Sequence, residues 1–299
     1  ATRLGMRSVS WRADAPATLY WAEANDGGDP AMETNERDIV YMQAAPFEGQ
    51  PTKLATTSLR YGGIVWGDEK RAWLNEQWWA NRMEKATIID PTKPGQAGNV
   101  IIERATTDRY NDPGNPMTIK NEYGRYVLKF DKDEVFMSSV GGSPEGDRPF
   151  LSRFNLKTKK QDILFRSEAP YYERPIDIIT EKADKIMTIR ESETEPQNYF
   201  IRDLKKGTLT AITDFPHPQP EMMEVNKEII KYKRADGVDL TAVLYTPAGY
   251  DKAKDGPLPV LMWAYPREFK DNNSASQITQ NKNEFTFPYW GSPIYWLTR

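Results

Sequence analysis

Short runs of strand-forming residues, separated by turn-forming clusters, recur from Val9 to about Phe215 and constrain the fold more than any other feature. Trp11 and Trp66 lie 55 residues apart at matching positions of this pattern, near the 40 to 50 or so residues of a four-stranded propeller blade with insertions. The window 71–85 also contains helix-favouring residues, but its place in the repeat favours strands. The pattern predicts a mainly β protein with a partial β-propeller of about four blades. The predicted strands include 18–23, 38–43, 63–68, 72–79 and 85–90, and the pattern continues less clearly through 134–139, 185–190 and 198–202.

Composition supports this class and excludes several others. Aromatic residues make up 12% of the chain, and the 19 glycines and 22 prolines supply turns. A net charge of −3 offers no basic footprint for nucleic acid, and no apolar run approaches the roughly 20 residues that span a bilayer. With no cysteine and His217 as the sole histidine, a Cys-based or two-His metal site is excluded. No phosphate-binding glycine loop occurs, so no cofactor is expected.

The pattern of short strand-forming runs and turns ends after Asp214. Proline occupies every second position from 216 to 220, which predicts a stiff extended connector. We therefore predict three parts: propeller blades over 1–214, a proline-rich linker over 215–222, and the beginning of another domain over 223–299.

The part after the linker has the pattern of an α/β domain. The pair Asp236-Gly237 predicts a hairpin turn between two strands. The apolar run 258–265 suits a strand covered on both faces, as in a mostly parallel sheet. The stretch 291–299 reads as the opening of a helix, with Ser292 as its N-cap.

This order of parts resembles the prolyl oligopeptidase family of serine peptidases, in which a β-propeller precedes an α/β-hydrolase domain. Within that family the chain is most similar to the glutamyl endopeptidase-like branch. The motifs that carry the resemblance are 8–14, 20–23, 26–30, 190–194, 198–200, 209–218, 230–251 and 258–270. The resemblance implies that 223–299 is the first part of an α/β-hydrolase domain.

Enzymes of this family hydrolyse peptide bonds by acyl transfer through a Ser, Asp and His triad whose serine lies in a G-x-S-x-G elbow. No such elbow occurs here: 141–145 lacks the final glycine, and Ser292 has only one neighbouring glycine. His217 lies in the linker, before any candidate serine, and is expected to be an exposed linker residue. The chain is therefore expected to be a fragment that ends before the triad and is inactive by itself.

The resemblance implies one catalytic group within the chain. Tyr265, at the end of the apolar run, matches the tyrosine that donates its hydroxyl to the oxyanion hole. Otherwise Tyr265 is an aromatic strand end packed beneath a loop. Arg267 could pair with a substrate carboxylate, as glutamate selectivity requires, or could be a loop arginine paired with Glu268.

Other charged and aromatic groups have two interpretations each. Glu191, Glu193 and Glu195 could bind a substrate amine or form a solvated turn. Trp78 and Trp79 are expected to pack between blades rather than to bind a ligand.

The function predicted from all of this is peptide hydrolysis after glutamate or aspartate, with peptides as the expected partners. Two alternatives stay open: a dipeptidyl- or acylaminoacyl-peptidase of the same family, and a non-catalytic propeller that binds partners. The lack of cysteine fits an exported or periplasmic protein, and the sequence leaves the oligomeric state open.

Overall fold

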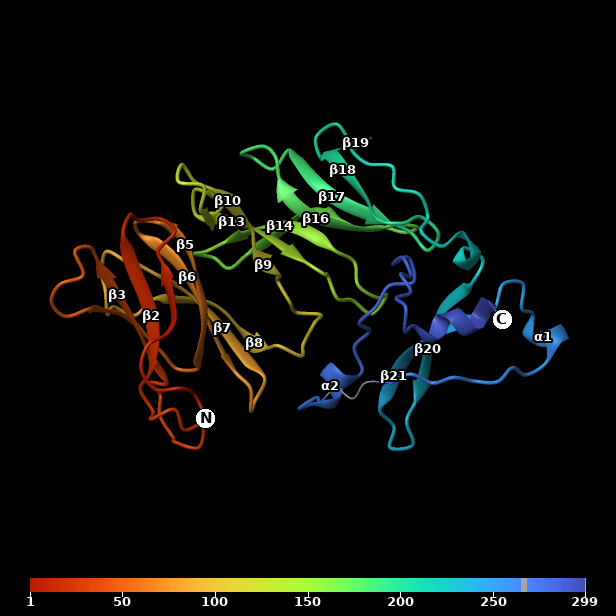
Figure 1. Ribbon diagram of the computed structural model, residues 1–299, viewed down its shortest axis with the longest axis horizontal. Coiled ribbons are helices and arrows are strands. Elements are labelled where there is room, and N and C mark those ends of the chain that lie inside the picture. Colours follow the sequence, from red (N-terminus) through yellow and green to blue (C-terminus); the bar gives the residue numbers. More distant parts are fainter. Residues whose placement is uncertain (265–267, 299) are drawn as a thin grey trace. The chain divides into compact units, whose positions relative to one another are not determined.

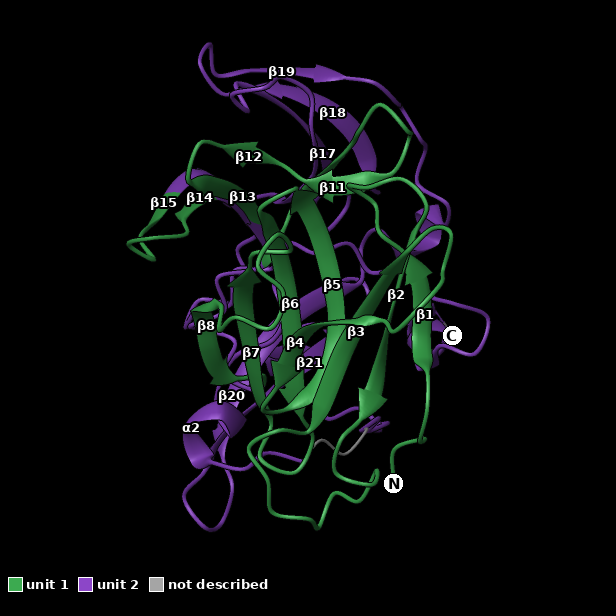
Figure 2. Cartoon of the chain, turned by 90° about the vertical axis from the view of Figure 1, so that its left-hand side faces the viewer, with its two compact units in different colours: residues 1–106, 115–137, 153–162 green, residues 107–114, 138–152, 163–299 purple. Residues whose placement is uncertain are grey.

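The computed structural model describes residues 1–264 and 268–298 and consists mainly of antiparallel strands (Figure 1). The chain divides into two compact units, coloured separately in Figure 2. Unit 1 contains 1–106, 115–137 and 153–162, and unit 2 contains 107–114, 138–152 and 163–299.

The first two sheets lie in unit 1, and each is a four-stranded antiparallel meander. The first sheet contains β1 (Arg7–Trp11), β2 (Thr18–Ala24), β3 (Asp38–Ala44) and β4 (Thr52–Thr57) in that order. The second contains β5 (Arg60–Asp68), β6 (Arg71–Trp78), β7 (Met83–Ile89) and β8 (Asn99–Ala105). Strands in the ambiguous window 71–85 are thus confirmed. The sequence analysis missed β4, in which only Leu54 and Ala55 are apolar, and it also missed β8.

Two further sheets repeat this arrangement. The third has the order β12 (Phe130–Asp131), β13 (Glu134–Ser139), β14 (Phe150–Asn155) and β15 (Gln161–Arg166), with β9 (Asn115–Pro116) also pairing with β13. The fourth contains β16 (Tyr172–Ile178), β17 (Lys185–Glu191), β18 (Asn198–Asp203) and β19 (Thr208–Ala211). A small ribbon pairs β10 (Thr118–Lys120) with β11 (Tyr126–Leu128). The mainly β class is confirmed, and the sheets are consistent with propeller blades.

Apolar clusters hold the sheets of unit 1 together. One cluster joins Tyr20, Val40 and Leu54 of the first sheet to Trp66 and Leu74 of the second. These side chains come from alternate positions of their strands, because a strand turns every second residue to the same face. A second cluster is made by Trp73, Ala86, Ile101, Leu128, Val135, Met137, Phe154 and Leu156. Alternation along each strand therefore fills both faces of the second sheet.

The predicted hairpin is confirmed in unit 2. Strands β20 (Asn226–Lys233) and β21 (Asp239–Thr246) pair in register from Asn226 with Thr246 to Lys233 with Asp239. Gly237 has a φ of 88°, a conformation in which a side chain would be strained. Short helical turns complete this part: η1 (Pro220–Met222), α1 (Lys252–Asp255), α2 (Asn272–Ala275) and η2 (Pro293–Thr298). The helix expected from 291 onward is thus a 3₁₀ helix.

The apolar run 258–264 does not form the covered strand that its composition predicts. Val260 is 83% exposed, and Met262 is 85% exposed. A central strand needs a hydrogen-bonded neighbour along each edge, and within 1–264 and 268–298 this run has none. The hydrolase-domain start over 223–299 and the boundaries 1–214 and 215–222 stay predictions.

Among the residues that the structure describes, no helix is long and apolar enough to cross a bilayer.

Candidate functional site

The two residues assigned to chemistry by the sequence, Tyr265 and Arg267, lie outside the described residues. Their roles therefore stay predictions. The other charged or titratable groups that the sequence analysis named, Glu191, Glu193, Glu195 and His217, lie in unit 2.

The acidic run after β17 separates into three different environments. Glu191, the last residue of the strand, is 2% exposed, whereas Glu193 is half-buried and Glu195 is exposed. The backbone N–H of Glu195 donates to Ser192 Oγ at 3.0 Å, which closes a tight turn. The solvated-turn interpretation is right for Glu195 and wrong for Glu191.

A buried lysine on the hairpin lies close to these carboxylates. Lys227, on β20, is 8% exposed, and its Nζ donates to the backbone carbonyl of Glu284 at 2.7 Å. Burial lowers the pKa of Lys227, while the charges of Glu284, Glu193 and Glu191 oppose this shift. The lysine thus connects the hairpin, the turn after β17 and the segment around Glu284.

Glu191 has the opposite perturbation. Burial raises the pKa of Glu191, and the negative charge of Glu284 raises it further, while a hydrogen bond with Gln197 and the charges of Arg174 and Lys227 lower it. Its Oε2 atom is buried and has no hydrogen-bond partner.

A second buried carboxyl lies in the loop before β14. Asp147 is 5% exposed and pairs through Oδ2 with the guanidinium of Arg109 at 2.6 Å, whereas its Oδ1 atom is buried without a hydrogen-bond partner. Burial raises the pKa of Asp147 despite the nearby arginine. The pKa of Tyr172 is also raised, first by burial and then by the charges of Glu284 and Asp147.

These groups form the candidate site of unit 2, which we call the buried charge cluster. It consists of Asp147, Tyr172, Arg174, Glu191, Glu193, Lys227 and Glu284. Perturbed pKa values in one place are typical of functional sites, although structural ion networks also produce them. No group of three His, Cys, Asp or Glu residues able to hold a metal occurs among the described residues.

His217 differs from the expectation for an exposed linker residue. Its ring is half-buried and packs edge-on against Phe285, with the ring centroids 4.9 Å apart. Its Nδ1 atom accepts a hydrogen bond from the Gln219 N–H at 3.0 Å. Ser292 is 9% exposed, and its Oγ accepts from the Ile294 N–H at 3.4 Å, so it caps η2 as predicted.

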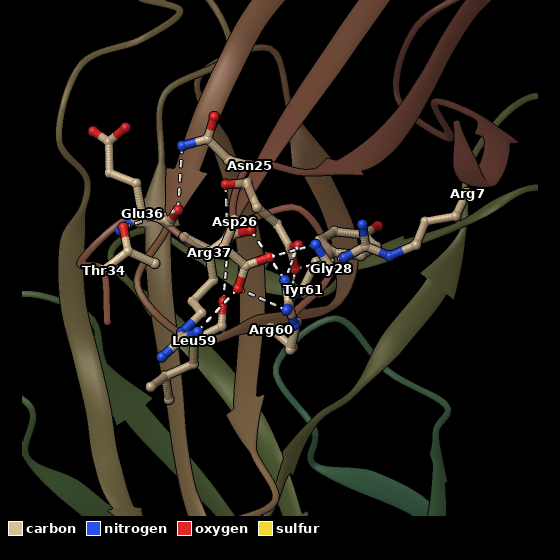
Figure 3. A network of polar contacts seen from close by, with 12 residues as sticks. Arg7, Asn25, Asp26, Gly28, Thr34, Glu36, Arg37, Leu59, Arg60 and Tyr61 are labelled. Atoms are coloured by element: carbon tan, nitrogen blue, oxygen red, sulfur yellow. Dashed lines mark hydrogen bonds and ion pairs between the residues drawn. The ribbon is translucent and has the colours of Figure 1, made fainter. Parts of the chain in front are cut away.

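Unit 1 has a polar network that the sequence analysis did not predict (Figure 3). Asp26 accepts hydrogen bonds from Arg37 at 2.9 Å and Arg60 at 2.7 Å. Asp38, whose side chain is fully buried, pairs with Arg60 at 2.9 Å and with Arg7 at 2.5 Å. Both carboxylates are therefore fully paired, with guanidinium groups and with the backbone N–H groups of Gly28 and Tyr61, as expected of a network that stabilises the fold.

The loop after β2 explains why this network forms. Asp26 Oδ1 also accepts a hydrogen bond from the Gly28 N–H at 3.0 Å. Only glycine fits at position 28, because a Cβ there would lie 2.0 Å from the carbonyl oxygen of Thr2. Burial alone would raise the pKa of Asp26, but the hydrogen bonds from Arg60 and Arg37 outweigh burial and lower it. The Asp-Gly-Gly motif thus serves a buried ion network.

The two adjacent tryptophans also differ from expectation. Trp79 is 79% exposed, with the Arg82 guanidinium 3.4 Å from its ring centroid, so the predicted inter-blade packing is wrong for this residue. Trp78 is half-buried beneath the Arg37 guanidinium, 4.2 Å from its ring centroid. It completes the arginine network.

The amino-acid sequence was compared with known proteins. No protein-family model matches the sequence. The chain is 40% identical over 315 residues to a protein of Oryza sativa subsp. japonica named "Probable glutamyl endopeptidase, chloroplastic". It is also 40% identical over 316 residues to a protein of the same name from Arabidopsis thaliana. Both alignments cover 100% of this chain but only 34% and 33% of the relatives, so the chain spans about a third of their length.

A solved structure gives a more distant likeness. Dipeptidyl peptidase 4 of Porphyromonas gingivalis has 11% sequence identity and a TM-score of 0.46, with 95% of this chain and 50% of that chain covered. The alignments along the whole chain show that it is related to proteins named as endopeptidases, over about a third of their length. More particularly, it is a homologue of the plant glutamyl endopeptidases, which confirms the resemblance carried by its motifs.

Proposed function

We propose that this chain is part of a serine peptidase of the prolyl oligopeptidase family that hydrolyses peptide bonds by acyl transfer, with preference for glutamate or aspartate at the cleavage site. The observation that carries the proposal is the 40% identity along the whole chain to plant proteins named glutamyl endopeptidases. The repeated four-stranded sheets support it, because a propeller of such blades can restrict access of substrates to a peptidase site.

In this proposal Tyr265 donates its hydroxyl to the oxyanion that forms when the serine attacks the peptide carbonyl. A donor at this place stabilises negative charge that is absent from the bound substrate, so it acts on the rate of the chemical step. The support for this role is the match of 258–270 to the family motif.

Arg267 selects the acidic side chain of the substrate in the same proposal. A planar guanidinium can bind a carboxylate through two parallel hydrogen bonds, which a lysine cannot reproduce. Replacement by lysine should therefore retain charge attraction but lose part of the preference for glutamate.

The activity is tested on the intact enzyme that contains this sequence. A fluorophosphonate probe should label a serine, and fluorogenic peptides with a blocked amino terminus should be cleaved after Glu and Asp but poorly after Gln and Lys. Failure of the probe to label would refute the peptidase proposal. Cleavage restricted to peptides with a free amino terminus would instead identify a dipeptidyl-peptidase.

The selectivity is tested by the variants Arg267→Ala and Arg267→Lys, with Lys254→Ala as a control at an exposed lysine, 80% exposed in its side chain. Arg267→Ala should raise KM for the Glu peptide and leave the Gln peptide almost unchanged. Unaltered Glu preference in Arg267→Ala would dismiss this role while leaving the peptidase proposal intact.

A further inference from the structure

A segment of unit 2, residues 277–285, lies against loops of the same unit and is called the strap here. At its beginning, Gln277 Oε1 accepts hydrogen bonds from the backbone N–H groups of Arg109 at 2.7 Å and Tyr110 at 3.3 Å. The backbone N–H of Ile278 donates to the Tyr110 hydroxyl at 2.9 Å. The strap thus begins on the 107–114 loop.

The middle of the strap is fastened to the loop that precedes β14. Asn281 Nδ2 donates to the Asp147 carbonyl at 2.6 Å, and the Asp147 N–H donates to the Gln280 carbonyl at 3.2 Å. Gly146 permits this approach, because a Cβ at that position would lie 2.5 Å from the Gln280 oxygen. Two chain segments therefore meet backbone to backbone.

The end of the strap reaches the buried charge cluster. Lys227 Nζ donates to the Glu284 carbonyl at 2.7 Å, and the Glu284 carboxylate acts electrostatically on both Lys227 and Glu191. Ile278 and Phe285 are the large apolar side chains that the strap buries, at 5% and 9% exposure. Most of these contacts of the strap are hydrogen bonds, and the strength of a hydrogen bond depends on nearby charge.

Two carboxyls that interact with the strap, Asp147 through its backbone and Glu191 through the charge of Glu284, lack full solvation or pairing. Glu191 and Asp147 are 2% and 5% exposed, and each has one buried oxygen without a hydrogen-bond partner. Burial makes the ionised form of each carboxyl more costly and so favours the protonated form more than water would. Lifting the strap would remove the charge of Glu284 and admit water to the cluster, so both carboxyls could then ionise at less cost.

We infer that the strap is a pH-sensitive element, which docks more tightly when Glu191 and Asp147 are protonated and loosens as these carboxyls lose their protons. The inference does not depend on the proposed peptidase activity, because it concerns only contacts inside unit 2.

The docked form raises the pKa of Glu191 and of Asp147, mainly through burial, so docking is favoured below their ordinary values and weakened as pH rises through the raised values. Lys227 has the opposite sign, because burial lowers its pKa, but a lysine starts from an ordinary value of about 10.4. A comparison in mildly acidic and neutral solution therefore excludes the lysine, and the carboxyl variants separate the carboxyls from the imidazole of His217, which packs against Phe285.

The neighbouring charged and titratable groups also belong to this balance. They are Asp108, Arg109 and Tyr110 in the 107–114 loop, Tyr172 and Arg174 on β16, Glu193 after β17, His217 packed against Phe285, Lys227 on β20, Tyr245 on β21, and Lys282 and Glu284 in the strap.

Hydrogen exchange of the intact protein tests the inference. Protection of peptides covering 277–285 is measured at about pH 5.0 and pH 7.5, with exchange times scaled by an unstructured reference peptide. A shift of one pKa unit would change the opening equilibrium about tenfold, and because both shifts are upward, protection should be higher at the lower pH. Peptides from β6 in unit 1 serve as the internal reference and should show no such change.

Two variants assign the effect. Glu191→Gln and Asp147→Asn, uncharged and of nearly the same shape, should each reduce the ratio of protection between the two pH values. Glu195→Gln, at an exposed position in the same turn, should retain the wild-type ratio. Equal protection of the wild-type strap at both pH values would overturn the inference without any variant. An unchanged ratio in both Glu191→Gln and Asp147→Asn would also overturn it.

Discussion

The ion network of unit 1 allows a quantitative test of how this fold is stabilised. Replacing Asp26 by asparagine keeps the shape and the acceptor for the Gly28 N–H but removes the charge between Arg37 and Arg60. Asp26 is 1% exposed, so water cannot replace the lost carboxylate without opening the loop. In the variant, the guanidinium groups of Arg37 and Arg60 therefore lose the buried carboxylate that neutralises part of their charge.

The magnitude follows from the geometry. At about 4 Å between charge centres and an effective dielectric constant of about 20, each pair contributes about 4 kcal/mol of Coulomb energy, much of which desolvation offsets. Removing one partner of a buried ion network costs about 3 to 5 kcal/mol. Arg60 keeps Asp38, and Arg37 keeps the face of Trp78, so we expect about 3 kcal/mol for Asp26→Asn.

Urea unfolding of the intact chain, followed by circular dichroism, measures this cost. With a slope of about 1 to 3 kcal/mol per molar urea, the midpoint of unit 1 should fall by about 1 to 3 M. Asp133→Asn is the matched control, because Asp133 pairs with Lys157 at 2.7 Å while its side chain is 49% exposed, and its midpoint should stay near wild type. Equal midpoints for Asp26→Asn and Asp133→Asn would refute the argument that the buried pairs stabilise this unit.

Acid titration provides a second measurement on the same residue. Because the pKa of Asp26 is lowered in the folded chain, its contribution to stability is present above the unfolded pKa of about 3.9 and is lost as pH falls through the lowered value. Wild-type and Asp26→Asn chains should therefore converge in stability in strong acid.

Three further outcomes follow. Gly141→Ala places a Cβ 1.9 Å from the Arg148 carbonyl oxygen, whereas the Cβ of Gly124→Ala meets open space. Gly124→Ala should cost about 1 to 2 kcal/mol because of its backbone conformation alone, and Gly141→Ala should lower the free energy of unfolding by more. Equal thermal midpoints for the two variants would contradict this. Trp79→Ala should cost less than about 1 kcal/mol in urea unfolding, because the ring is 79% exposed and interacts mainly with a cation. In the intact enzyme, Tyr265→Phe should lower kcat by about 10²- to 10³-fold with little change in KM, and an unchanged kcat would remove Tyr265 from the oxyanion hole.

The elements that the sequence predicted are those with a strong local pattern. β6 and β7 lie where repeat spacing favoured strands over a helix, and the turn at Asp236-Gly237 lies where its φ preference requires. β4 was missed because two adjacent apolar residues make too short a pattern. The run 258–264 has the composition of a covered strand but lacks a neighbouring strand among the described residues, and composition cannot supply one.

The amino-acid sequence by itself determined the mainly β class, the repeat and the relationship to glutamyl endopeptidases, because strand alternation, turn preference and motif identity are properties of nearby residues. The tertiary structure alone decided which charges are buried. Glu191 and Glu195 are four positions apart in one acidic run, yet packing buries the first and leaves the second in solvent. Burial depends on how segments that are distant in the sequence pack together, and no local pattern predicts that packing.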